Sequence, residues 1–187
     1  MALQLHNLSI GEVSVNGKGA KSAPFLYGKD PVIWIPGSQM QVAYEPGVYS
    51  GEDVSRVNLV LRPPEDVRLQ LQALDDFVVS YITENSERVL GKHLTQDQVA
   101  ARYQPVLRHS DKQYPPSLRV KMNRDGKYAC KFWQHKEPRH APETWSGSSV
   151  TVRLHVKSLY LMGQNFGVTI DVTDVSIESE PTSYCPF

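Results

Sequence analysis

The chain of 187 residues contains only two cysteines, Cys130 and Cys185. Neither lies in a Cys-x-x-Cys pair or a Cys/His array, so a disulfide framework and a zinc site are both disfavoured. This cysteine usage is typical of a reducing compartment. No apolar run approaches the roughly 18 residues of a membrane span, and the first residues lack the pattern of a signal peptide. We therefore expect an intracellular protein, cytoplasmic or nuclear, that is neither secreted nor held in a membrane.

Motifs of common enzyme classes are also missing. The sequence has no GxGxxG, no Walker A loop, no GxSxG and no HExxH. His135 and His140 have a spacing seen in metal sites, but no third ligand is near them in the sequence. Asp75 and Asp76 are adjacent, so on a helix they do not share a face, and we interpret them as solvated. We expect no catalytic residues, no metal and no cofactor, and a protein that is not an enzyme.

The formal net charge is zero, but charge is unevenly distributed along the chain. Residues 88–140 contain twelve basic and four acidic residues, a net charge of +8. Residues 52–87 carry a net charge of −5, and residues 170–187 carry four acids and no base. A basic segment of this kind favours a polyphosphate partner, although a solvated surface would also explain it.

Hydrophobic periodicity predicts strands, then helices, then strands again. Alternating or short apolar runs indicate strands at 3–8, 11–15, 32–35, 40–44 and 57–61. Apolar residues then recur at spacings of three and four from Val67 to Ile82, which marks one face of an amphipathic helix that ends near Gly91. Thr95 and Gln98 form a capping box for a second, short helix.

The C-terminal half reads as strands. The pattern predicts a hairpin with arms 117–122 and 128–133, a long strand at 150–161, and a last strand at 168–177 with a bulge between Val172 and Val175. The fold class is therefore mostly β (α+β). We favour an OB-like antiparallel β-barrel with an inserted amphipathic helix, and a β-sandwich with an inserted helical segment is the alternative. The expected organisation is a single OB-like domain at 1–178, with the helical insertion around 64–104, and a flexible acidic tail at 179–187.

The basic segment is interleaved with aromatic residues, which is what a binder of single-stranded nucleic acid needs. Phosphates attract cations, and unstacked bases pack against aromatic rings. Strand alternation places cationic side chains and one tryptophan on a common face. We interpret Tyr128 and Phe132 as core residues and expect Trp145 to be exposed in a loop. The candidate nucleic-acid-binding residues are Arg119, Lys121, Arg124, Lys127, Lys131, Trp133, Arg153 and Lys157.

Two parts of the sequence resemble single-stranded DNA-binding proteins (SSBs). The chain ends in Pro186-Phe187 after acidic residues, which is similar to the tip of bacterial SSBs, although residues 183–185 stand where those proteins are acidic. Podophage-type SSBs also have an acidic tail that ends in an aromatic residue. The resemblance implies a partner-binding tail that includes Glu178, Glu180, Pro186 and Phe187.

The second part is the C-terminal block. Residues 116–121, 147–152, 159–160, 165–168 and 172–175 resemble the layout P-x-L-x-x-K, G-x-x-V, aromatic, F-G-x-x, V of SSBs from phages and large DNA viruses. The resemblance implies a non-catalytic protein that coats single-stranded DNA, or RNA, in replication, recombination or repair. It would contact replication or repair proteins through the tail and could form homo-oligomers. The alternative is a structural or assembly protein of the viral coat or scaffold type, built on a β-sandwich.

Overall fold

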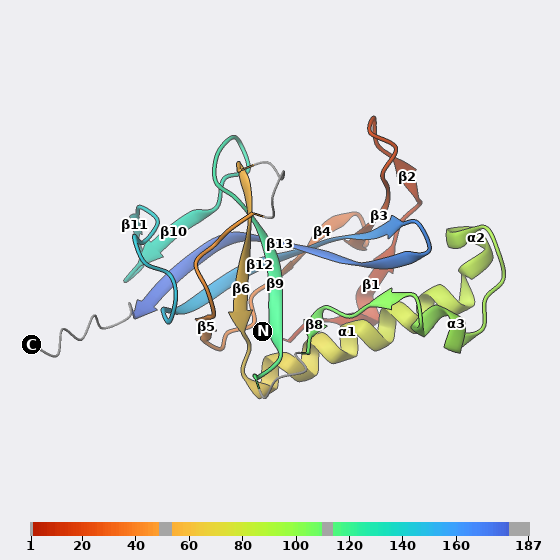
Figure 1. Ribbon diagram of the computed structural model, residues 1–187, viewed down its shortest axis with the longest axis horizontal. Helices are drawn as coiled ribbons and strands as arrows, with labels where there is room; N and C mark the ends of the chain where they lie inside the picture. The colour runs from red at the N-terminus through yellow and green to blue at the C-terminus, as the bar shows by residue number, and fades with distance from the viewer. Residues whose placement is uncertain (1, 49–53, 110–113, 180–187) are drawn as a thin grey trace, which may run out of the picture.

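The N-terminal third of the chain forms short strands in the computed structural model, which describes residues 2–48, 54–109 and 114–179 (Figure 1). The segment predicted as one strand at 3–8 is instead a 3-10 helix followed by β1, because Leu5–Asn7 turns before pairing begins. The elements are η1 (Leu5–Asn7), β1 (Leu8–Ile10), β2 (Ser14–Val15), β3 (Lys21–Tyr27), β4 (Asp30–Trp34), β5 (Met40–Val42) and β6 (Arg56–Arg62).

The helical insertion lies where the periodicity predicts it. Helix α1 (Glu65–Glu84) begins after Pro64, has two acidic residues in its first turn, and buries the face that runs from Val67 to Ile82. Helix α2 (Ser86–Leu90) ends at Gly91, which adopts the left-handed conformation that glycine tolerates. Helix α3 (Gln96–Ala100) has the predicted capping box between Thr95 and Gln98. None of the helices within the described residues is long and apolar enough to cross a membrane.

The second half adds β7 (Tyr103–Gln104), β8 (Leu107–Arg108), β9 (Ser117–Asn123), β10 (Lys131–Gln134), β11 (Glu137–Arg139), β12 (Ser149–Met162) and β13 (Asn165–Ser179). The predicted hairpin between 117–122 and 128–133 is wrong. Strand β9 pairs with β6, β8 and β13, whereas β10 pairs with β11 and runs parallel to β13. The two arms are neighbours of the same third strand rather than of each other, which alternation alone cannot distinguish.

Five strands close a circuit of hydrogen-bonded pairs. Strand β12 pairs with β5, β5 with β6, β6 with β9, β9 with β13, and β13 with β12. Only the β9–β13 pair in this circuit is parallel. The circuit fits an OB-like barrel, which is a five-stranded, partly open Greek-key structure, better than it fits two stacked sheets. The β12–β13 ribbon continues past the barrel and also pairs with β3 and β4 (Figure 1).

The barrel interior and the inner face of α1 form one hydrophobic core. Leu59, Leu118, Val120, Leu154 and Val175 are completely buried there. Burying an aliphatic side chain of this size contributes about 1.5–3 kcal/mol relative to leaving it exposed. Because successive side chains of a strand point to opposite faces, the residues between these buried ones point out of the barrel. The buried positions therefore determine which side chains lie on the outer face.

Three register shifts interrupt the β12–β13 pairing, and two of them decide which residues lie on the outer face. The register shifts between Arg153 and Leu154 leave Thr173 as an extra residue, which is the bulge predicted in the last strand. A second shift between Val156 and Ser158 leaves Lys157 as an extra residue in β12. Each extra residue reverses the inward and outward alternation that follows it. Asp171 and Asp174 consequently share the outer face although they are three residues apart.

Cys130 is buried, as expected of a small apolar side chain. Burial and the nearby Asp174 carboxylate raise the pKa of its thiol to about 12. Because the thiolate is the reactive form, we expect iodoacetamide at pH 8 to leave Cys130 unmodified in the folded protein and to alkylate it after unfolding in urea. Peptide mass spectrometry of the two samples measures this. Equal alkylation of Cys130 in both would contradict the burial.

Candidate nucleic-acid interface

Six of the eight predicted residues point outward from the same side of the barrel. In β9, Arg119 and Lys121 alternate with the buried Leu118, Val120 and Met122. Register extends this outer face across the neighbouring strands. Lys121 lies opposite Asp171 of β13, while Lys131 of β10 and Arg153 of β12 flank Asp174 on its two sides. The residues that share the face are Arg119, Lys121, Lys131, Trp133, Arg153 and Lys157.

The larger depression on this face lies between the 123–131 segment and the β12–β13 ribbon. It has a volume of about 520 Å³. Tyr128, which we interpreted as a core residue, is 74% exposed here, because it precedes β10 in a turn rather than lying within a strand. The Lys127 ammonium lies 5.5 Å from the centre of the Tyr128 ring, a cation–π contact. Four of the predicted nucleic-acid-binding residues line this depression, namely Lys127, Lys131, Arg153 and Lys157.

Two aspartates hold the cations of this depression in place. The Asp171 carboxylate accepts from Arg56 at 2.5 Å and from Lys157 at 2.9 Å. Asp174 lies 3.6 Å from the Arg153 guanidinium and accepts a hydrogen bond of 3.1 Å from the Trp133 indole nitrogen. The carboxylates fix the positions of the cations and lower the local positive charge, so a bound polyanion has to compete with them.

His155 lies on the same outer face, opposite Asp171 in the register. Burial lowers the pKa of its imidazole, Lys157 lowers it further, and Asp171 acts in the opposite direction. His155 is therefore neutral at pH 7, and at that pH the positive charge of the depression comes from lysine and arginine.

Arg124 is separated from the other predicted residues. It lines a different depression with Glu45, Phe132 and Trp145, and its backbone nitrogen donates to the Ser55 carbonyl oxygen. Trp145, expected to be exposed, is buried, and its ring meets Phe132 edge to face at 5.6 Å. Its backbone nitrogen donates to the Glu45 carboxylate, which binds the loop to the barrel. The residues that follow Trp145 in the sequence are serine and glycine, which do not indicate that its ring packs on Phe132.

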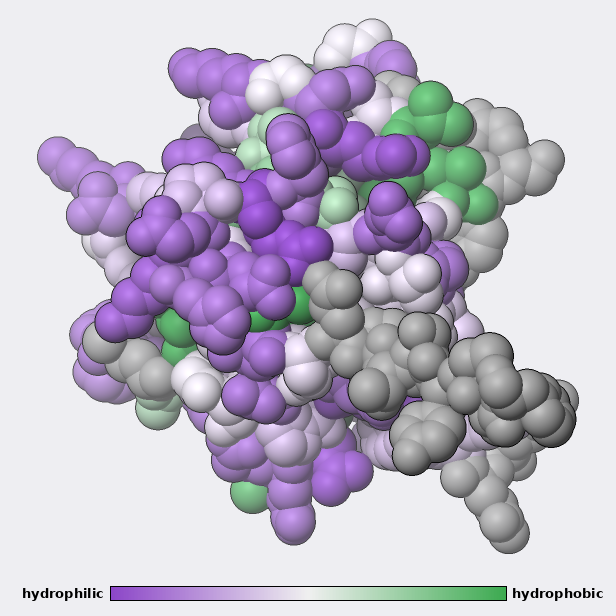
Figure 2. All heavy atoms as spheres, turned by 90° about the vertical axis from the view of Figure 1, so that its left-hand side faces the viewer, coloured by the Kyte–Doolittle hydropathy of each residue, from purple (hydrophilic) through white to green (hydrophobic). Residues whose placement is uncertain are grey.

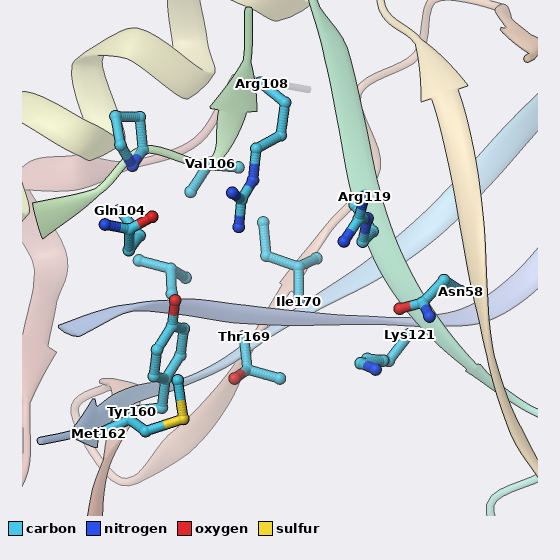
Figure 3. Close-up of a pocket in the computed structure, with 12 residues that line it drawn as sticks. Asn58, Gln104, Val106, Arg108, Arg119, Lys121, Tyr160, Met162, Thr169 and Ile170 are labelled. Atoms are coloured by element: carbon cyan, nitrogen blue, oxygen red, sulfur yellow. The ribbon is translucent and has the colours of Figure 1, made fainter. Parts of the chain in front are cut away.

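A second depression, of about 410 Å³, opens on the outer face beside Arg119 and Lys121 (Figure 3). Most of its lining residues were not among the predicted ones, including Asn58 of β6, Arg108 of β8 and Tyr160 of β12. Asn58 could have been found from its outward position between Val57 and Leu59, which are buried. Arg108 and Tyr160 could not, because β8 is two residues long and the bulge at Lys157 decides the direction of Tyr160.

The remaining predicted residues belong to the tail. Glu178 is exposed near the end of β13, so the strand reaches the first residue of the predicted tail. Glu180, Pro186 and Phe187 lie outside the described residues. No group of three or more potential metal ligands occurs in the described ranges, and Asp75, expected to be solvated, is buried. The end of the molecule that carries β10 and β11 is mostly hydrophilic and has only small apolar patches (Figure 2).

Comparisons with known proteins find similarity in structure only. No family model matches the sequence, and no curated protein matches it. A single-stranded DNA-binding protein from bacteriophage Enc34, solved in complex with single-stranded DNA, superposes with a TM-score of 0.52 at 12% identity. The match covers 92% of this chain and 97% of that one. A second structure of the Enc34 single-stranded DNA-binding protein superposes with a TM-score of 0.48 at 10% identity, over 96% of both chains. At this identity, the likeness to the complex shows a shared fold.

Proposed function

We propose that this chain binds single-stranded DNA along the outer face of the barrel, without catalysis and without sequence preference. The observation that carries the proposal is the convergence of five cations from the three strands β9, β10 and β12 onto one surface, namely Arg119, Lys121, Lys131, Arg153 and Lys157. In OB-folds, the face of the second and third barrel strands binds oligonucleotides, and here those strands are β6 and β9. Cationic side chains that contact the phosphates, together with aromatic rings that stack on the bases, bind single-stranded nucleic acid of any sequence.

The shape of the surface also favours a single strand over a duplex. The larger depression is lined by Asp171 and Lys157, and the second is lined by Lys121, which lies opposite Asp171, so the two depressions adjoin on the outer face. A flexible strand follows such a path and turns its bases toward Tyr128 and Trp133, whereas the bases of a duplex are stacked inside it. The fold shared with the Enc34 protein is consistent with this use of the surface.

The proposal extends to the processes that expose single strands, which are replication, recombination and repair. RNA offers the same phosphates and bases, so binding to RNA is part of the proposal. Glu178, Glu180, Pro186 and Phe187 are proposed to bind partner proteins. The alternative assembly role was based on a β-sandwich, whereas the strand pairs among the described residues form a closed circuit, which favours the barrel.

Fluorescence anisotropy of a labelled oligo-dT of about 30 nucleotides tests the proposal. We expect tight binding at 50 mM salt that weakens steeply by 300 mM, because each neutralised phosphate of a single strand contributes roughly −0.7 to the slope of log K against log salt. A duplex of the same length is the control and should bind more weakly. Absence of binding at 50 mM salt, or equal binding of the duplex, would refute the proposal.

A further inference from the structure

The second depression is lined by residues of β6, β7, β8, β9, β12 and β13. Asn58 and Lys121 line one side of it, Tyr160 and Met162 line the opposite side, and Arg108 reaches in from β8 (Figure 3). Thr169 and Ile170 of β13 lie between these sides. The segment that leads into β8 is anchored to α1, because the buried Asp75 carboxylate accepts hydrogen bonds from the Tyr103 hydroxyl and the Val106 backbone nitrogen.

Its electrostatics differ from those of the larger depression. Arg108, Arg119 and Lys121 line it, and its described lining residues include no aspartate or glutamate. The larger depression contains Asp171 and Asp174, which neutralise part of its positive charge. Three cationic side chains thus line the second depression, which suits an anionic group.

Tyr160 provides an aromatic surface in a fixed position. It lies opposite Gly167 in the register, and a Cβ atom at Gly167 would come within 2.7 Å of the Tyr160 hydroxyl oxygen and 3.0 Å of the Gln104 carbonyl oxygen. The absence of a side chain at Gly167 thus allows the ring to lie against the strand. The ring is only half-buried, and its accessible part faces the depression.

An unpaired acceptor also faces this site. Asn58 is only 8% exposed, its Nδ2 donates to the Gly47 carbonyl oxygen at 3.4 Å, and its Oδ1 has no partner among the described residues. Leaving a buried acceptor without a hydrogen bond costs roughly 1–3 kcal/mol. Such an atom beside a cationic, aromatic hollow indicates a ligand that carries an N–H donor as well as negative charge.

We propose that the second depression is a nucleotide subsite, in which an unstacked base packs on Tyr160 and the adjoining phosphate lies beside Arg108 and Arg119. The Asn58 Oδ1 accepts from an N–H group of a base edge. This inference deepens the proposed function, because it extends the bound strand beyond the predicted residues, past the Asp171 ion pairs, to the end of the β12–β13 ribbon.

The test compares Tyr160→Leu, Tyr160→Phe and the control Tyr44→Leu by oligo-dT anisotropy. We expect about 5- to 100-fold weaker binding for Tyr160→Leu, since stacking of one base is lost, and near wild-type binding for Tyr160→Phe, which keeps the ring. Tyr44 is exposed and lines neither depression, so its substitution should leave affinity unchanged.

Photocrosslinking of the wild-type protein to an oligonucleotide that carries 5-iodouracil supplies a second readout, which a purely structural role of Tyr160 would not produce. We expect peptide mass spectrometry to identify Tyr160 as a crosslinked residue. Unchanged affinity of Tyr160→Leu would overturn the proposed subsite, and so would crosslinks that avoid residues 160–162. In either case, binding of oligo-dT by the wild-type protein would still support the proposed function. Failure of the wild-type protein to bind would refute both.

Discussion

Reversing the charges of Lys131 and Arg153 together should weaken binding to oligo-dT by about 10- to 1000-fold at 50 mM salt. The two side chains flank Asp174 from neighbouring strands and line the same depression. Replacing both with glutamate changes the local charge by four units at the centre of the proposed path. The salt dependence should also become shallower, because fewer phosphates are neutralised. Anisotropy titrations at several salt concentrations measure both effects.

A matched control separates the local effect from the change in net charge. Lys29→Glu combined with Lys92→Glu alters the net charge by the same amount at two exposed positions that line neither depression. We expect this variant to bind within a few-fold of wild type. Equal weakening of both double variants would show that long-range charge, rather than the outer face of the barrel, governs binding. Circular dichroism checks that each variant is folded.

Replacing Asp75 with alanine should lower the free energy of unfolding by roughly 2–4 kcal/mol, the largest stability effect that we expect from one polar side chain here. The carboxylate accepts from the Tyr103 hydroxyl at 2.5 Å and from the Val106 nitrogen at 3.0 Å. Alanine leaves both donors buried without an acceptor. The neighbouring Asp76 is exposed and contacts only Gln72 among the hydrogen bonds described, so Asp76→Ala should cost less than about 0.5 kcal/mol.

The pH dependence of stability gives an independent check on Asp75. Burial raises the pKa of its carboxyl above the ordinary value of 3.8, although hydrogen bonds from Tyr103 and Val106 oppose the shift. A raised pKa means that folding favours the protonated form. The resulting stabilisation is complete below pH 3.8 and is lost as the pH rises through the pKa of the folded state.

Urea unfolding of wild type and Asp75→Asn, at pH 7 and at pH 4, measures this contribution. Relative to the asparagine variant, the wild type should gain stability as the pH falls, because only the wild type can take up the proton. A difference between the two proteins that does not change with pH would contradict the raised pKa. Asp75 also anchors the segment before β8, which carries Arg108, so Asp75→Ala should make this side of the second depression more mobile.

Most of the cationic face could be predicted from alternation within single strands. Leu118, Val120 and Met122 are apolar, so Arg119 and Lys121 must point the other way once β9 is placed. The same reasoning placed Lys131 and Trp133 together, even though the hairpin assumed to join their strand to β9 does not exist. The prediction of a shared face succeeded because both strands pair with β13 and present the same side to solvent.

Residues that depend on bulges or on distant packing could not be placed in this way. Alternation counted from Val150 assigns Tyr160 to the interior, and only the extra residue at Lys157 turns it outward. Asp75 looked like half of a solvated acidic pair, but its burial depends on Tyr103 and Val106, about thirty residues away. Trp145 looked exposed in its loop because its partners Glu45 and Phe132 are distant in the sequence.

The sequence by itself determined the mostly β class, the amphipathic helix with its caps, and the basic strands, because these follow from local periodicity and composition. Only the tertiary structure decided which strands are neighbours, that Lys157 is an extra residue in β12, and how the cations are divided between two depressions. Pairing between strands far apart in the chain depends on the closure of the barrel as a whole. The sequence of one β-strand does not identify the strand with which it pairs.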